Sequence, residues 1–139
     1  MKVVLDVNVI VAAMLSRHGA PAALIQEWQK GAFELTVSPL LLAELRRVLE
    51  YPKISQRISS DDTEAALRLI AASGVMLPNP VGPSAVVSRD RNDNYLIVLA
   101  ESARGPIVSG DKDLLSLAGL VRVYSPAEFL SLLRSIKPD

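Results

Sequence analysis

The 139-residue sequence contains no cysteine, so it can form neither a disulfide nor a thiolate zinc site. It has one histidine, His18, which excludes a histidine-rich metal centre. Aromatic residues make up only 4% of the chain, so its core must consist mainly of Leu, Val, Ile and Ala, as in α/β or all-α proteins. The absence of cysteine fits a reducing compartment, and we expect a cytoplasmic protein.

Several other features are also missing. The formal net charge is zero, so a nucleic-acid surface would have to be a local patch. No apolar run approaches the roughly 20 residues of a membrane span, and Asp6 and Asn8 interrupt the apolar stretch from Val3 to Leu15. The sequence contains no P-loop, no dinucleotide-binding glycine motif and no G-x-S-x-G nucleophile elbow. We therefore expect no membrane association, no P-loop or Rossmann-type nucleotide site, and no serine hydrolase.

The apolar pattern predicts alternating strands and helices in one domain over residues 1–139. We expect Asn8 to cap the first helix, and Asp61 with Glu64 to form a capping box. The alternation predicts an α/β fold with a mostly parallel central sheet flanked by helices in three layers. The expected strands are 2–5, 33–37, 75–77, 106–109 and 120–124, and the expected helices are 8–15, 21–30, 39–50, 62–73, 94–103, 111–117 and one opened by the capping box of 125–128.

Four acidic residues lie where such a sheet binds ligands. Asp6 and Asp111 each follow a strand, and Glu44 and Asp93 lie on helices that could reach the same crevice. Each also has a structural alternative: Asp93 and Asp111 could cap helices, and Glu44 could pair with Arg47 at the surface. Asp6 could be a turn residue at the end of its strand, although its apolar neighbours favour a functional role. A carboxylate cluster without cysteine or histidine favours Mg²⁺ or Mn²⁺ over zinc.

At these residues the sequence resembles the PIN-domain family, in particular its small VapC-like toxin-antitoxin proteins. The matching pieces are LDVNV at Leu5–Val9, AEL around Glu44, NDNYLIVLA from Asn92 and VSGDKDLL from Val108, in that order along nearly the whole chain. The resemblance implies a parallel sheet flanked by helices, with an acidic pocket that holds Mg²⁺ or Mn²⁺ and cleaves single-stranded RNA.

The resemblance also assigns roles by position. It makes Asp6, Glu44, Asp93 and Asp111 the catalytic and metal-binding acids. Accessory positions are Asn8, Ser109, Asp90 and Asp113, of which Asp90 competes with Asp93, and Asp113 with Asp111. Cations near the acids in sequence could contact RNA, and these are Arg46, Arg47, Lys53, Arg57, Arg89, Arg91 and Lys112. The family further implies a homodimer and a small antitoxin partner.

Two other functions are compatible with the residues. The first is a non-catalytic PIN-like module that binds RNA or protein, although intact acids at all four matched positions argue against it. The second is a metal-dependent phosphatase. The aspartate that a D-x-D nucleophile motif would need two residues after Asp6 is replaced by Asn8, which lowers that alternative.

Overall fold

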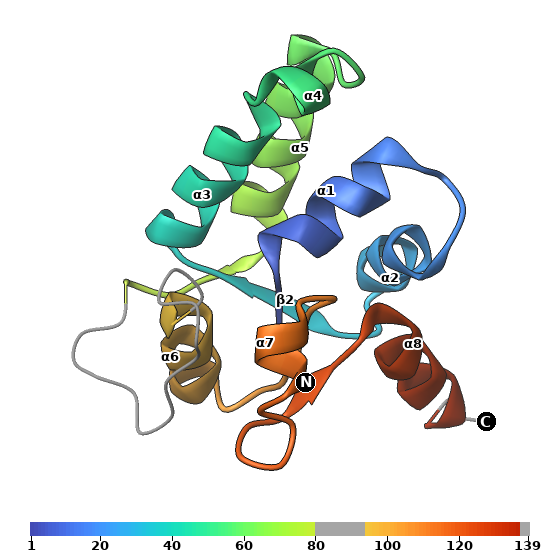
Figure 1. The fold of residues 1–139 in the computed structure, drawn as a ribbon, viewed down its shortest axis with the longest axis vertical. Coiled ribbons are helices and arrows are strands. Elements are labelled where there is room, and N and C mark those ends of the chain that lie inside the picture. Colours follow the sequence, from blue (N-terminus) through green and yellow to red (C-terminus); the bar gives the residue numbers. More distant parts are fainter. Residues whose placement is uncertain (80–93, 137–139) are drawn as a thin grey trace.

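The computed structural model describes residues 1–79 and 94–136 as a sheet with helices packed on both of its sides (Figure 1). The predicted α/β fold is confirmed. The elements in chain order are β1 (Lys2–Leu5), α1 (Val7–Leu15), α2 (Ala20–Gln29), β2 (Glu34–Val37), α3 (Pro39–Leu49), α4 (Pro52–Ser55), α5 (Ser60–Ser73), β3 (Val75–Met76), α6 (Asn94–Ala103), β4 (Ile107–Val108), α7 (Lys112–Leu115), β5 (Val123–Tyr124) and α8 (Pro126–Ser135).

The described strands form one five-stranded sheet in the order β3-β2-β1-β4-β5, and every pairing in it is parallel. The chain first builds outward from β1 through β2 to β3, and then returns to place β4 on the other side of β1. Strand order therefore reverses at β1. In open parallel sheets a crevice forms outside the carboxyl ends of the strands at such a point, and ligands bind there.

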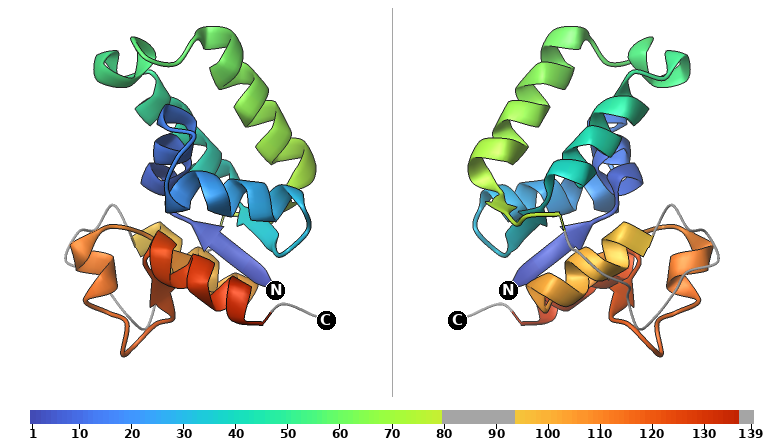
Figure 2. Two further views of the ribbon diagram at one scale, coloured as in Figure 1. Left: turned by 90° about the vertical axis from the view of Figure 1, so that its right-hand side faces the viewer. Right: turned by 90° about the vertical axis from the view of Figure 1, so that its left-hand side faces the viewer.

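The central strand is apolar because it is covered on both faces. Val3, Val4 and Leu5 have no exposed surface, and all three belong to the hydrophobic core. Figure 1 shows α6 on one side of the sheet and α2 with α8 on the other, and Figure 2 shows the same arrangement from two further directions. Parallel strands that are buried on both faces are expected to have continuous apolar sequences, and β1 has one from Val3 to Leu5.

Helix caps explain where two helices begin. Asp6, rather than the predicted Asn8, caps α1, because its carboxylate accepts a hydrogen bond from the backbone N–H of Asn8. Ser59, rather than Asp61, caps α5 by accepting from the N–H of Asp62. In both cases the helix starts earlier than predicted. Ser38 caps α3 by accepting from the N–H of Leu41, and the predicted capping box of Ser125 with Glu128 is confirmed.

Gly105 brings β4 close to β1. A Cβ atom at this position would lie 1.8 Å from the backbone oxygen of Lys2, so no larger residue fits without moving one of the strands. The backbone N–H of Val4 bonds to the Pro106 carbonyl at 3.0 Å just beyond this contact. The close approach fixes the position of β4, and therefore of the residues that follow it.

No single helix in the described ranges is long and apolar enough to cross a membrane. In these ranges one pair of consecutive helices, α1 with α2, reaches that length and apolar composition when the two are taken together, but the chain bends by 99° between them.

Candidate metal centre at the carboxyl edge of the sheet

The candidate site lies where β1 and β4 end side by side. Leu5 is the register partner of Val108, so the next residues in each strand, Asp6 and Ser109, lie level with each other. The backbone N–H of Asp6 continues the ladder by bonding to the Val108 carbonyl at 2.9 Å. The reversal of strand order thus brings together two side chains that are far apart in sequence.

A chain of hydrogen bonds runs from Asp6 through Ser109 to Asp111. The Ser109 hydroxyl donates to Oδ2 of Asp6 at 2.7 Å, and its oxygen accepts from the backbone N–H of Asp111 at 2.9 Å. Ser109 has no exposed surface, and Asp6 is also buried. One hydroxyl therefore fixes a buried carboxylate on β1 and the backbone of the loop that carries the second acid.

Both acids also cap helices. Asp6 Oδ1 accepts from the N–H of Asn8 at 3.2 Å, and Asp111 Oδ1 accepts from the N–H of Asp113 at 2.7 Å. Asn8 and Asp113, predicted as accessory positions, thus contribute backbone groups to these contacts. Capping and a functional role are compatible for Asp6 and Asp111, because each cap hydrogen bond holds its carboxylate in a defined orientation.

Burial raises the pKa of Asp6, because the charged carboxylate loses its hydration. Hydrogen bonds from Ser109 and Asn8 lower this pKa, and the negative charge of Asp111 raises it. The net direction is upward. The described residues include no salt-bridge partner for either carboxylate. Asp6 and Asp111 repel each other when both are ionised, and a bound cation would relieve that repulsion.

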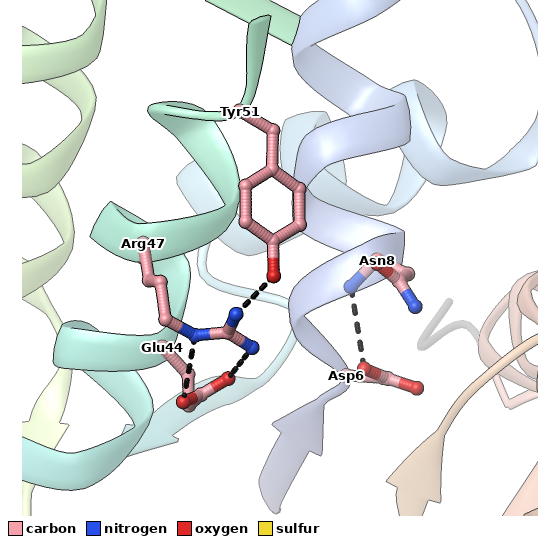
Figure 3. A network of polar contacts seen from close by, with 5 residues as sticks. All are labelled: Asp6, Asn8, Glu44, Arg47 and Tyr51. Atoms are coloured by element: carbon pink, nitrogen blue, oxygen red, sulfur yellow. Dashed lines mark hydrogen bonds and ion pairs between the residues drawn. The ribbon is translucent and has the colours of Figure 1, made fainter. Parts of the chain in front are cut away.

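Glu44 belongs to a separate network on α3. Its two carboxylate oxygens accept from Arg47, with Nη2 to Oε2 at 2.8 Å and Nε to Oε1 at 3.2 Å, and Nη1 of Arg47 donates to the Tyr51 hydroxyl. Figure 3 shows this network apart from the contact between Asp6 and Asn8. The predicted alternative for Glu44, a pair with Arg47, is therefore what the structure contains. Tyr51 was not predicted, because it lies just beyond the end of α3, where helical spacing no longer indicates which side chains meet.

The described acids do not all converge. In residues 1–79 and 94–136, no three Asp, Glu or His side chains are close enough together to hold a metal ion. Asp6 and Asp111 supply the hard oxygen ligands that suit Mg²⁺ or Mn²⁺, and the electrostatics at Asp6 fit a cation there. Glu44 is neutralised by Arg47 instead. Asp93 and its competitor Asp90 lie outside the described residues, as do Arg89 and Arg91.

The remaining positively charged residues that were predicted to contact RNA lie in different surroundings. Arg46 of α3 forms a bidentate ion pair with Glu64 of α5, with N–O distances of 2.6 and 3.2 Å, and so links the two helices. Lys112 is exposed at the start of α7, next to Asp111. Lys53 and Arg57 are exposed at and just after α4, a short helix that the sequence did not predict. Of these cations, only Lys112 directly adjoins one of the two acids in sequence.

Comparison with known sequences gives two matches. The family model described as PIN domain matches residues 2–113, a span that includes Asp6, Glu44 and Asp111. The Uncharacterized protein MJ1680 of Methanocaldococcus jannaschii is 28% identical over 117 residues, which cover 84% of this chain and 75% of that protein.

Comparison with solved structures shows the same fold. The crystal structure of VapBC2 from Rickettsia felis, bound to a DNA fragment from their promoter, matches with a TM-score of 0.59 at 15% identity, over 90% of this chain and 98% of the matched chain. FitAcB from Neisseria gonorrhoeae matches with a TM-score of 0.56 at 17% identity, over the same shares of the two chains. At these identities the likeness concerns the fold alone.

Proposed function

This chain belongs to the PIN-domain family, and on that premise we propose that it is a divalent-metal-dependent endoribonuclease that cleaves single-stranded RNA. The metal is Mg²⁺ or Mn²⁺. One observation carries the proposal: Asp6 is buried at the point where strand order reverses, and Ser109 links it to Asp111. Burying a carboxylate beside another is costly for the fold alone, so the arrangement favours a functional reason.

In this proposal the chain's own residues hold the reacting groups. Asp6 and Asp111 would hold the metal, with Asp93 as a third acid and Glu44 as a fourth once it is released from Arg47. Ser109 orients Asp6 through its hydroxyl. When bound, the ion lowers the pKa of an attacking water and stabilises charge that develops on the phosphate.

Removal of metal is expected to stop cleavage. An RNA of mixed sequence, labelled at its 5′ end, is incubated with the protein in Mn²⁺ or Mg²⁺, and products are resolved on a denaturing gel. We expect internal cuts that disappear with a chelator and return when the cation is added in excess, because the proposed mechanism needs the ion to lower the pKa of the attacking water and to stabilise charge on the phosphate.

A matched variant controls for the effect of replacing an acid away from the site. Asp61 is an exposed acid on α5, far along the chain from the site, so Asp61→Asn should cleave as well as the unchanged protein. Cuts that survive the chelator would contradict the proposed metal dependence.

A second function is favoured by the pairing of Glu44 with Arg47. If Glu44 stays neutralised, the described residues offer two acids, and the protein would bind RNA or protein without cutting it. The same assay separates the two functions. RNA retained in a band-shift experiment but left intact in Mn²⁺ would indicate the binding module.

We further propose that the chain is the toxin of a toxin-antitoxin pair and forms a homodimer. Support comes from the resemblance of its fold to proteins solved as VapBC2 and FitAcB. If so, the protein should elute at twice its mass in size-exclusion chromatography. The product of an adjacent small reading frame should co-elute with it and suppress cleavage. A monomer that keeps its activity beside every neighbouring gene product would contradict this assignment.

A further inference from the structure

The contact between Glu44 and Arg47 has the geometry of a strong ion pair in an exposed position. Both carboxylate oxygens are occupied by one guanidinium group, with distances of 2.8 and 3.2 Å. The side chains remain partly open to solvent, Arg47 at 56% and Glu44 at 33%. The guanidinium carbon also lies 5.2 Å from the centroid of the Tyr51 ring, a cation–π contact. Arg47 is therefore held by two partners, of which only Glu44 is an acid.

The pair lies on the helix that begins beside the candidate site. Tyr51 follows just beyond the end of α3, and Glu44 and Arg47 lie within this helix, where side chains lean toward its start. That start is Ser38, which lies level with Asp6 by the register of β1 with β2. Glu44 is six residues farther, about 9 Å along the helix axis. Glu44 is therefore within about two helical turns of the end of α3 that adjoins Asp6.

Arg46, the neighbouring residue, provides a contrast. Its fork to Glu64 joins two helices, and both partners come from the surface between α3 and α5. Breaking that pair would loosen the packing of α5 on α3. The pair of Glu44 with Arg47 joins residues of one helix, so it can open without moving any element of the fold.

We infer that Arg47 exchanges partners: it neutralises Glu44 in the metal-free protein, and it contacts a phosphate of the RNA once a divalent cation has taken Glu44. This inference rests on the proposed function, whose substrate and metal it uses. A guanidinium fork fits carboxylate and phosphate groups equally well, which is the property such an exchange requires. The guanidinium keeps its contacts with Tyr51 in both states. Since exposed ion pairs are weak, opening this one lowers the metal affinity by only about 2- to 5-fold.

The exchange predicts opposite effects of one substitution on two ligands. Arg47→Gln should bind Mn²⁺ alone about 2- to 5-fold more tightly in calorimetry, because Glu44 no longer has a competing partner. The same variant should bind a single-stranded RNA oligonucleotide about 5-fold more weakly in fluorescence anisotropy with Ca²⁺, under conditions where a gel shows the RNA intact. The slope of log affinity against log salt concentration should fall by about 0.7, the value for one lost phosphate contact on a single strand.

A second variant tests the exchange from the acid. Glu44→Gln frees Arg47 without removing it, so it should bind RNA more tightly than the unchanged protein in the absence of divalent cation, and Mn²⁺ more weakly. Lys30→Gln is the matched control, because Lys30 also forms an ion pair with an acid three residues earlier on its helix, Glu27. It removes one positive charge, and both affinities should stay unchanged.

The outcomes separate this inference from the proposed function. Equal or weaker Mn²⁺ binding by Arg47→Gln, or an unchanged salt slope, would overturn the exchange even if the protein cleaves RNA. Opposite shifts in the two affinities would support the exchange even if no cleavage is found, in which case only the nuclease proposal fails.

Discussion

Asp6→Asn is expected to reduce RNA cleavage by at least about 100-fold. Substitutions of groups that merely orient metal ligands typically cost 10- to 100-fold in metal affinity or activity, and Asp6 is proposed as a ligand itself. Asparagine caps helices as well as aspartate does, so α1 keeps its start and the variant should fold. Cleavage is measured at saturating Mn²⁺ with Asp61→Asn as the matched control.

The same variant should unfold at a higher temperature than the unchanged protein when metal is absent. Asparagine removes a charge that is costly to bury and that is repelled by Asp111. Burial raises the folded-state pKa of Asp6, so the folded protein keeps a proton that the unfolded chain releases above the ordinary aspartate pKa of about 3.9. The stability contributed by that proton is present below this value and is lost as pH rises through the raised pKa.

Two measurements check this linkage. The difference in unfolding free energy between variant and unchanged protein should grow from acidic to neutral pH without metal. Added Mn²⁺ should then stabilise only the unchanged protein, because a ligand stabilises the state that binds it. If Asp6→Asn cleaves RNA as fast as the unchanged protein, Asp6 has no role in the reaction. If the variant is clearly less stable than the unchanged protein without metal, Asp6 is a structural residue.

Ser109→Ala is expected to reduce cleavage by about 10- to 100-fold, because Asp6 loses the hydroxyl that orients it. It should also destabilise the metal-free fold by about 1–3 kcal/mol, the cost of leaving a buried acceptor and the Asp111 N–H without their partner. The pKa of Asp6 should rise further, since the Ser109 hydrogen bond lowers it. Cleavage and thermal unfolding are compared at equal concentrations of folded protein.

Two further variants test whether the hydroxyl itself is responsible. Ser109→Thr keeps the hydroxyl and should retain most of the cleavage per folded molecule, although its extra methyl group must fit a fully buried position. Ser135→Ala removes an exposed hydroxyl that donates to a backbone carbonyl, and it should change neither property. If the Ser109→Ala variant cleaves RNA at the rate of the unchanged protein, Ser109 plays no part in the reaction.

Much of the fold was predictable because apolar periodicity and turn residues mark the elements directly. The run Val3 to Leu5 predicted a buried strand, and β1 is that strand. Helix starts were less predictable, because several nearby residues can cap equally well. Asp6 and Asn8 compete at α1, and tertiary contacts of β1 with β4 decide the choice by fixing Asp6 at the strand end.

The site was predictable only in part. Asp6 and Asp111 could be placed at one edge of the sheet, because parallel strands end together, although their shared partner Ser109 was expected from family resemblance rather than from geometry. The state of Glu44 could not be decided from sequence, because its spacing from Arg47 permits both an ion pair and a metal ligand. The choice depends on side-chain rotamers and solvent, which periodicity does not encode.

The hydrogen bond between Ser109 and Asp6 joins residues 103 positions apart, and this separation has a consequence for the timing of folding. Closing so long a loop costs chain entropy, and contacts distant in sequence form slowly. During synthesis the N-terminal part of a chain emerges first. Asp6 therefore gains this partner only after the chain through Ser109 has been synthesised and has left the ribosome. Any activity that needs the oriented Asp6 carboxylate would be absent from the nascent chain until that moment.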